Sequence, residues 1–465
     1  MSAHRPVGPT LAEQLGRFAA DTPMESVPAL ALERAKMIVA STLASASRGV
    51  DIASTRALHA AEIQLGSSGP CGLWFGAGTL APDRAARVNA VASDSAASDD
   101  SDLRSIAHIG TPTTAAGLAV AQWRARSGRE LLAALVMGYE IAGRVDEALT
   151  PGRMQRGFHG SVSTIFGATV TAGRLLRLDA QKMARALSLA ASSACGMAIA
   201  ADTSCAREYH AGLAAMLGVQ AAVAAESGFE SESAVLESPR GFFEAMNGQA
   251  VEQVAEGLGA SWDIVTDMAI KLMPGAHPFH AIAQAAIEIA VAHDLKPEQV
   301  AAATISAPQL KVWAHQAVPP HDLISAAHSV PYFVACAIAD RRIGWNLFSP
   351  EKMFDPVVVS MIGRIGFDPD PPAHPDRFGH RHGGTVVVTT TDGRLLTHTC
   401  KAPRGSGTTG IEWADVEDKY RALVPRPECS GDRVEQSLAV IRKLEDQASV
   451  DPLIRLIRPV LDGST

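Results

Sequence analysis

The sequence predicts a mostly α-helical protein, made of a large all-helical domain and a smaller α+β domain. Hydrophobic residues make up 47% of the 465 positions, but aromatic residues only 5%, and 39 positions are glycine. This composition favours helices that pack closely through small side chains over a sheet of β-branched and aromatic residues. The length also exceeds that of most single domains, so two domains are expected.

The large domain is expected to cover residues 1–269. Helical runs such as 28–47 and 82–98 alternate there with short breaks rich in Gly, Pro and Ser. Within each run, apolar residues recur at spacings of three and four, with small residues where helices would touch. Residues 403–465 return to this helical pattern and are expected to complete the same domain.

The smaller domain is expected to cover residues 270–402. Residues 299–313 and 384–400 are rich in β-branched side chains, and the second run contains Asp392-Gly393 between two apolar stretches. This arrangement is a strong signal for a β-hairpin. Helical stretches lie between the two runs, so the domain is predicted to be α+β.

Composition also excludes several classes of protein. The net charge is −8 and the basic residues are scattered, so no surface for nucleic acid is expected. The apolar runs are too short to span a bilayer, and the first residues do not form a secretory signal, so a cytoplasmic protein is expected. The six cysteines are far apart and never form CxxC, so neither a disulfide framework nor a metal site is suggested.

The first polar cluster is an acidic loop, residues 97–112, ahead of an expected helix. Three carboxylates within four residues repel one another unless a cation or a helix end meets them. Taken alone, the loop is either a solvated helix cap or part of a site, since loops carry function more often than other elements. Its polar residues are Asp99, Asp100, Ser101, Asp102, Arg104 and His108.

A histidine stands at the start of an expected buried helix. His159 precedes the small and apolar residues 160–176. The positive end of the helix dipole favours the neutral form of an imidazole there, and the neutral form can accept a proton. A catalytic base is one interpretation of this position; a buried histidine bonded to a backbone carbonyl is the other.

A third cluster combines a cation with a histidine. Arg207 and His210 are three residues apart and share one face if the segment is helical. The small residues of 211–215 favour burial of that face, although an amphipathic surface turn has the same spacing.

The fourth cluster lies between the two expected domains. Lys271, His277 and His280 surround Pro274 and Gly275. A lysine at this place is able to reach a pocket between domains, where ligand sites concentrate. A linker lysine in solvent is the alternative interpretation.

In order and spacing, these clusters resemble the MmgE/PrpD family, which contains 2-methylcitrate dehydratase, cis-aconitate decarboxylase and iminodisuccinate epimerase. The resemblance covers almost the whole chain. The acidic loop is similar to a D-x-D-D-[TS] element followed by a histidine, and GFHGS, residues 157–161, is similar to G-[WF]-H-x-[ST]. REYHAGLA, residues 207–214, is similar to K-x-x-H-x-G-x-A, and KLMPGAHPFH, residues 271–280, to K-x-x-P with a histidine six residues past the proline.

The chain departs from the family pattern at three positions. Ala97 replaces the first Asp of the loop. Arg207 replaces a lysine, which keeps the charge but loses a group that readily gives up a proton. Ala276 stands where some members have a histidine, and His277 follows it.

The resemblance implies an all-helical domain with an α+β lid, a homodimer, and an active site in the cleft between domains. It also implies small di- or tricarboxylic acids as substrates, with no metal and no organic cofactor. The residues that it assigns to catalysis are His159, Lys271, His108, Asp100 and Ser101, and those that it assigns to substrate binding are Arg207, His210, Asp99 and His280. His277, one step past the departure at Ala276, is also expected to bind substrate.

A hydro-lyase that dehydrates an acid such as 2-methylcitrate is the first expectation. Dehydration needs a base for the proton beside a carboxylate, cations for the developing charge and an acid for the leaving hydroxide. We expect His159 to move the proton, and Arg207 and Lys271 to hold carboxylates. Epimerisation and decarboxylation pass through similar carbanions and stay open as alternatives, as does a helical binding protein without catalysis.

Overall fold

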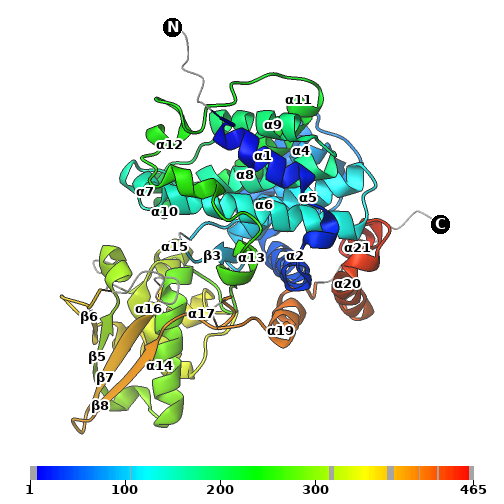
Figure 1. Ribbon diagram of the computed structural model, residues 1–465. Coiled ribbons are helices and arrows are strands. Elements are labelled where there is room, and N and C mark those ends of the chain that lie inside the picture. The colour runs from blue at the N-terminus through cyan, green and yellow to red at the C-terminus, as the bar shows by residue number, and fades with distance from the viewer. Residues whose placement is uncertain are drawn as a thin grey trace. The chain divides into compact units, whose positions relative to one another are not determined.

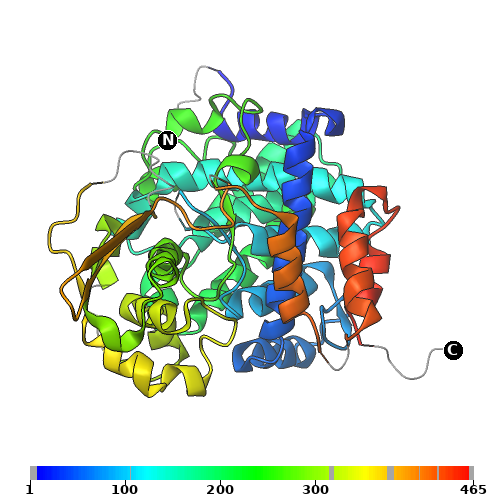
Figure 2. The ribbon, with the colours of Figure 1, turned by 90° about the horizontal axis from the view of Figure 1, so that it is seen from below.

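The computed structural model describes residues 8–104, 106–313, 319–373, 382–407, 409–426 and 429–459 (Figures 1 and 2). The chain forms two compact units, one made of Met1–Met268 and Val416–Thr465 and the other of Ala269–Asp415. The boundaries expected from the sequence lie at 269/270 and 402/403. Helices make up most of the first unit, while the second adds a four-stranded sheet. The predicted fold class, mostly α with a smaller α+β domain, is confirmed.

The first unit consists of helices joined by short connections, with a few very short strands. Among the described residues, no helix combines the length and the apolar character needed to cross a bilayer. The helices are α1 (Leu11–Asp21), α2 (Ala29–Gly49), α3 (Ala53–Gln64), α4 (Pro82–Ser95), α5 (Gly110–Trp123), α6 (Gly128–Leu149), α7 (Gly152–Gln155), α8 (Ser161–Leu175), α9 (Ala180–Ser193), α10 (Ala198–Thr203), α11 (Ala206–Glu226), α12 (Phe242–Ala245), α13 (Asp263–Thr266), α20 (Asp432–Arg442) and α21 (Asp451–Leu456). The strands are β1 (Cys71–Gly72), β2 (Thr79–Leu80) and β3 (Asp100–Asp102), and β4 (Met268–Ile270) lies at the boundary of the two units.

Helix α8 packs against α5, α6 and α11 within the first unit (Figure 1). It is buried along its whole length from Ser161 to Gly173. Glycines allow the close approach to α6, because a Cβ added to Gly138 would clash with Thr171 Oγ1 and lie 2.5 Å from the carbonyl oxygen of Gly167. The small-residue composition therefore has the structural role expected of it, which is to bring helix backbones together.

The C-terminal segment is bonded to the first unit through a buried lysine. Helix α19 (Trp413–Leu423) lies beside α2, as the orange and dark blue helices of Figure 2 show. The Lys419 ammonium donates to Ser41 Oγ at 2.8 Å and also to the carbonyl oxygen of Ser98. Ser47 Oγ donates to the Leu423 carbonyl oxygen at 2.6 Å. The last helices thus support the segment that leads into the acidic loop.

The second unit is built on a four-stranded sheet of order β6-β5-β7-β8. Strand β5 (Val300–Ser306) pairs parallel with β6 (Ile365–Phe367) and antiparallel with β7 (Gly384–Thr390). Strands β7 and β8 (Leu395–Cys400) form an antiparallel pair across Asp392-Gly393, so the predicted hairpin is confirmed. The helices are α14 (His280–Ala292), α15 (Leu323–Ala327), α16 (Val330–Asp340), α17 (Pro350–Met353) and α18 (Pro356–Ile362).

The close approach of α6 and α8 yields a prediction about stability. Gly138→Ala is expected to lower the free energy of unfolding by about 1–3 kcal/mol, because the new methyl group has no space against Thr171 and Gly167. Chemical denaturation of the purified variant measures the change. Gly76→Ala is the control, since the nearest atoms to its added Cβ lie 3.7 Å away. Equal stability of the two variants would contradict the packing argument.

Candidate active site

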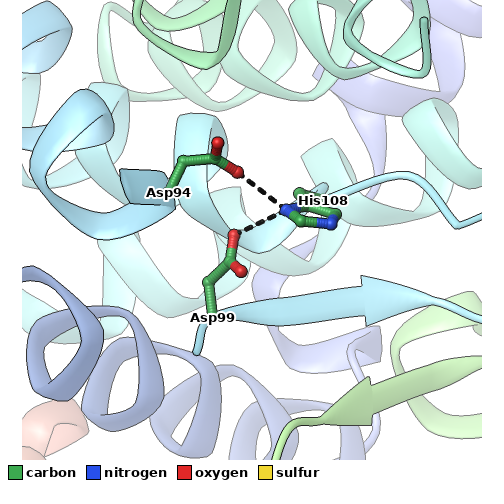
Figure 3. A group of neighbouring side chains, drawn as sticks. All are labelled: Asp94, Asp99 and His108. Carbon is green, nitrogen blue, oxygen red and sulfur yellow. Dashed lines mark hydrogen bonds and ion pairs between the residues drawn. The ribbon is translucent and has the colours of Figure 1, made fainter. Parts of the chain in front are cut away.

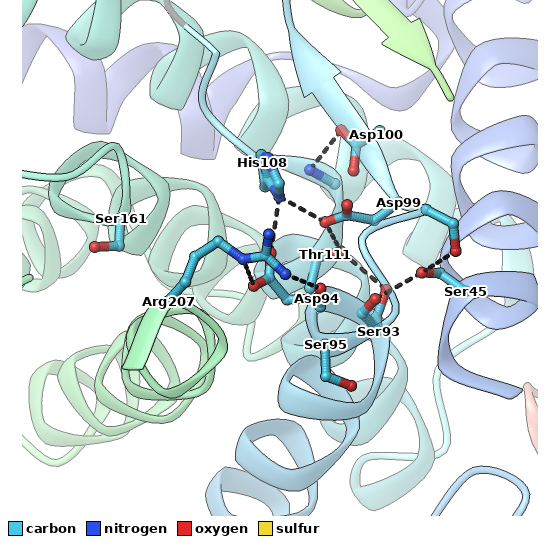
Figure 4. A network of polar contacts seen from close by, with 12 residues as sticks. Ser45, Ser93, Asp94, Ser95, Asp99, Asp100, His108, Thr111, Ser161 and Arg207 are labelled. Carbon is cyan, nitrogen blue, oxygen red and sulfur yellow. Dashed lines mark hydrogen bonds and ion pairs between the residues drawn. The ribbon is translucent and has the colours of Figure 1, made fainter. Parts of the chain in front are cut away.

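The acidic loop, α4, α5, α8 and α11 bring most of the predicted site residues of the first unit together (Figure 4). His108 precedes α5, and Arg207 lies in the first turn of α11. His159 lies just before α8, which packs against both of these helices. Segments that are distant in the sequence therefore contribute to one group of polar side chains.

His108 is held between two buried carboxylates, which both point toward the same ring nitrogen (Figure 3). Its Nδ1 lies 2.8 Å from Asp94 Oδ1 and 2.9 Å from Asp99 Oδ2. Since an ionised carboxylate only accepts hydrogen bonds, these distances place the ring hydrogen on Nδ1. The Nε2 edge of the ring then faces away from the two acids.

The two carboxylates are themselves anchored. Thr111 Oγ1 donates to Asp99 Oδ2 at 3.0 Å. Arg207 donates from Nε to Asp94 Oδ2 at 2.9 Å and from Nη2 to the Asp94 carbonyl oxygen at 2.8 Å. Burial by itself lowers the pKa of the Arg207 guanidinium, but Asp94 and the acids around it outweigh this and raise the pKa above its usual value.

Asp100 occupies the start of α5. Its Oδ2 accepts a hydrogen bond from the Gly110 backbone amide at 2.9 Å and another from the Tyr139 hydroxyl at 3.4 Å. A negative charge is stabilised at a helix N-terminus. Glycine is required at 110, because an added Cβ would lie 2.6 Å from the carboxyl carbon of Asp100. The repulsion foreseen among the loop carboxylates is thus relieved by separate partners.

Serines fix the backbone on either side of the acidic loop (Figure 4). Ser45 Oγ donates to the Ser93 carbonyl oxygen at 2.6 Å and lies 2.9 Å from Ser98 Oγ. Ser93 Oγ lies 3.0 Å from Thr111 Oγ1, which also bonds Asp99. This chain of hydroxyls links α2, α4 and α5 around the loop.

His159 is a neutral imidazole at neutral pH. Its pKa is lowered from the ordinary 6.5 to about 3, chiefly by burial and also by the nearby charges of Arg153 and His108. Its Nδ1 accepts a long hydrogen bond of 3.4 Å from the Ser161 backbone amide. The neutral form is thus favoured by burial and neighbouring positive charges, whereas the sequence suggested the helix dipole as the cause.

His210 lies next to His159, with ring centroids 5.9 Å apart. Burial lowers the pKa of His210 as well. Gly196 lets the backbone pass close by, since its added Cβ would clash with Ser161 Oγ and lie 3.3 Å from His210 Nδ1. Among the described residues, the buried His210 Nδ1 has no hydrogen-bond partner.

Ser101 and Asp102 lie on the buried strand β3. Ser101 Oγ is buried and has no hydrogen-bond partner within the described part of the chain. The pKa of Asp102 is raised to about 7, chiefly by burial and also by Asp267, against the opposing charge of Arg104. Arg104 pairs with both of these acids and with Asp263, so Asp102 belongs to an ionic network around Arg104.

Three of the predicted site residues belong to the second unit. His277 and His280 lie with ring centroids 4.5 Å apart, and the His280 ring stacks on Phe333 at 6.4 Å. Lys271 follows β4. The roles expected of these three side chains rest on the sequence alone.

Asp94 is the residue that sequence reasoning missed. It lies in the last turn of α4, three positions before Ala97, where the helical pattern of residues 82–98 predicts only one polar residue among several. Asp94, Asp99 and His108 are also close enough together to hold a metal ion. However, their distances of 2.8 and 2.9 Å are those of hydrogen bonds, and Arg207 already balances the charge of Asp94.

Comparison with known proteins identifies the family of the chain. The sequence model of the MmgE/PrpD N-terminal domain matches residues 13–254, and that of the MmgE/PrpD C-terminal domain matches residues 274–446. The chain belongs to the MmgE/PrpD family. The resemblance noted in the sequence is thereby confirmed.

Similar proteins include cis-aconitate decarboxylases. The protein of this name from Mus musculus is 27% identical over 82% of this chain and 79% of its own length. The one from Aspergillus terreus strain NIH 2624 is 24% identical over 96% of this chain and 95% of its own length. The one from Homo sapiens is 26% identical over 71% of this chain and 69% of its own length. A decarboxylase is a lyase, so these relatives support the prediction of an enzyme.

The depressed pKa of His159 predicts how stability depends on pH. The unfolded chain takes up a proton near pH 6.5, whereas folded His159 does so only near pH 3. The free energy of unfolding is therefore expected to fall as the pH drops below 6.5, by less than about 1.4 kcal/mol per unit because the ring is partly exposed. His159→Gln removes this contribution, so urea denaturation at several pH values is expected to show a shallower dependence. Parallel curves for the two proteins would contradict the assignment.

Proposed function

We propose that the protein is a cofactor-independent lyase that decarboxylates a small unsaturated tricarboxylic acid of the cis-aconitate type. Family membership and the names of the relatives support this reaction class. The observation that carries the proposal is the pair of imidazoles, one held neutral and one oriented by two acids, beside a guanidinium. Dehydration of 2-methylcitrate, the first expectation from the sequence, has no comparable support among these relatives.

Decarboxylation sets clear demands on such a site. The carbon–carbon bond to one carboxylate breaks and carbon dioxide leaves. The electron pair stays on the substrate and spreads into the neighbouring unsaturated carboxylate, and a proton is then added to carbon. Cations must therefore stabilise the developing charge, and a positioned acid must deliver the proton.

The residues of the first unit match these demands. A guanidinium has five N–H donors, and the bonds from Arg207 to Asp94 use two of them, which leaves others for a substrate carboxylate. An anionic substrate beside His159 favours its charged form, so this imidazole can take a proton from solvent as the substrate binds and then donate it to carbon. His108 offers its Nε2 edge, while His210, Asp99, Asp100 and Ser101 line or support the same group.

The second unit is proposed to contribute carboxylate-binding groups. This role for Lys271 and His280 rests on their match to the K-x-x-P element of the family, and that for His277 on its place between them in the sequence. Lys271→Met is expected to raise KM for the substrate more than it lowers kcat, because it removes a charge that binds the ground state as well as the transition state. An unchanged KM would remove Lys271 from the site.

A panel of acids tests the proposed reaction. Purified protein is incubated with cis-aconitate, citrate, 2-methylcitrate and iminodisuccinate, with and without a chelator, and release of carbon dioxide and proton NMR spectra are recorded. Carbon dioxide release from cis-aconitate is expected, and His159→Gln is expected to reduce turnover by about 10²-fold or more. His293→Gln, at an exposed histidine after α14, is the control and should keep full activity.

Other outcomes of the same panel point to other functions. Loss of water without carbon dioxide would identify a dehydratase. Exchange of a substrate proton for deuterium without net conversion would identify an epimerase. No reaction and no exchange with any acid would favour a binding protein.

We also propose that the protein is a cytoplasmic homodimer. Met197, Ile199 and Tyr209, on or beside the neighbouring helices α10 and α11, expose 53%, 69% and 45% of their surface. Adjacent exposed apolar side chains are typical of an interface. Light scattering is expected to show a molar mass of twice the 48.7 kDa of one chain. Ile199→Glu is expected to reduce the mass to that of one chain. Val357→Glu, at an exposed position of α18, is the control and is expected to leave the mass unchanged. A monomeric unmodified protein would contradict the proposal.

A further inference from the structure

Asp94 is an unusual place for a negative charge. Its side chain is 2% exposed and lies in the last turn of α4, where the helix dipole presents its negative end. Burial and the dipole both disfavour an ionised carboxylate there. Such a group persists only where strong partners compensate the cost.

Arg207 supplies that compensation at two atoms. It bonds the Asp94 side chain through Nε and the Asp94 carbonyl oxygen through Nη2. The second contact adds a donor to a carbonyl at the end of α4, which also accepts a hydrogen bond from the Ala97 amide at 3.0 Å. A lysine offers a single nitrogen on a flexible stem and cannot reproduce this planar fork.

Asp94, held by Arg207, in turn orients the His108 ring. Its other oxygen, Oδ1, lies 2.8 Å from His108 Nδ1, while Asp99 approaches the same nitrogen at 2.9 Å. Two acceptors on one nitrogen fix both the plane of the ring and the position of its hydrogen. Arg207 and His108 are thus joined through a single carboxylate (Figure 4).

Asp94 lies close in sequence or in space to two residues that depart from the family pattern. Ala97, three residues later, stands where the family pattern has the first Asp of the acidic loop, and it adopts a left-handed backbone conformation with φ of 51°. The other departure from that pattern within the group is Arg207, the partner of Asp94. The Arg207 departure therefore contacts the Asp94 carboxylate directly, and the Ala97 departure lies three positions after it, with its amide bonded to the Asp94 carbonyl oxygen at 3.0 Å.

We propose that Asp94 is a positioning residue that replaces the carboxylate absent at Ala97 and joins His108 and Arg207 into one unit. Asp94 itself does not touch the substrate in this scheme. It holds the His108 ring with its hydrogen on Nδ1 and holds the Arg207 fork in one orientation. The kinetic part of this inference rests on the proposed lyase function, while the state of the His108 ring does not.

The first measurement needs no activity. Nitrogen-15 NMR of the imidazoles, assigned with His108→Gln, reports which ring nitrogen carries hydrogen. In the unmodified protein, His108 is expected to carry it on Nδ1, and in Asp94→Asn the signal is expected to shift toward a mixture of the two tautomers. A ring with hydrogen on Nε2 alone in the unmodified protein would overturn the proposal even if the variant does not fold.

The second measurement is a kinetic cycle on the substrate that the acid panel identifies. Asp94→Asn is expected to lower kcat by about 10²-fold with a smaller change in KM, as expected when a catalytic group is misplaced. Because Asp94 and Arg207 act together, the double variant with Arg207→Lys should cost about as much as the worse single variant. If the loss of kcat in the double variant equals the product of the losses in the two single variants, the two residues act independently and the proposal is contradicted.

A matched ion pair elsewhere in the first unit provides the control. Arg87 on α4 donates to the buried Glu62 of α3 at 2.7 Å. Glu62→Gln is expected to lower the melting temperature but to leave kcat and the His108 spectrum unchanged. If Asp94→Asn behaves in the same way, Asp94 has only a structural role and the inference fails. If no acid of the panel reacts, the lyase function fails, and the spectra alone decide on Asp94.

Discussion

The burial of negative charge among closely packed helices is the constraint on which the first unit depends. Asp94, Asp99 and Asp100 lie within seven positions of one another and are almost fully removed from water. Asp94 and Asp99 share the His108 imidazole, and Asp94 also bonds the Arg207 guanidinium while Asp99 bonds the Thr111 hydroxyl. Asp100 bonds the amide at the start of α5. These partners come from α5, α11 and the segment before α5, so the positions of these elements and the charges of the loop are determined together.

The burial of these carboxylates also explains why small residues are frequent around the polar side chains of the first unit. The Asp100 carboxylate reaches the start of α5 only because residue 110 has no side chain. The backbone at residue 196 passes His210 for the same reason. Polar groups can then lie in a region with little water, where electrostatic interactions are stronger than at a surface. Small side chains thus serve chemistry as well as packing.

The sequence predicted the fold class and the main elements because they depend on local pattern. Spacings of three and four identified the helices, and Asp392-Gly393 identified the hairpin of β7 and β8. The acidic loop, His159 and the pair at Arg207 and His210 were also recognised, since their spacing is that of the MmgE/PrpD family. The details that depend on tertiary contacts were not predictable in the same way.

Asp94 shows the reason most clearly. The helical run 82–98 contains it as one polar residue among several, and α4 in fact ends at Ser95. Nothing local reveals that a residue 113 positions away will bond its carboxylate. Arg207 was accordingly expected to meet a substrate carboxylate, although in this structure its fork already bonds a carboxylate of the protein.

The bond from Lys419 to the backbone of Ser98 joins two residues that are synthesised far apart in time, so it forms only late in the folding of the first unit. The acidic loop leaves the ribosome early, but the lysine that supports it is made 321 residues later. A growing chain therefore carries the loop without this support until translation is almost complete. Chains that stop short of α19 lack the support permanently, so this contact distinguishes finished molecules from truncated ones.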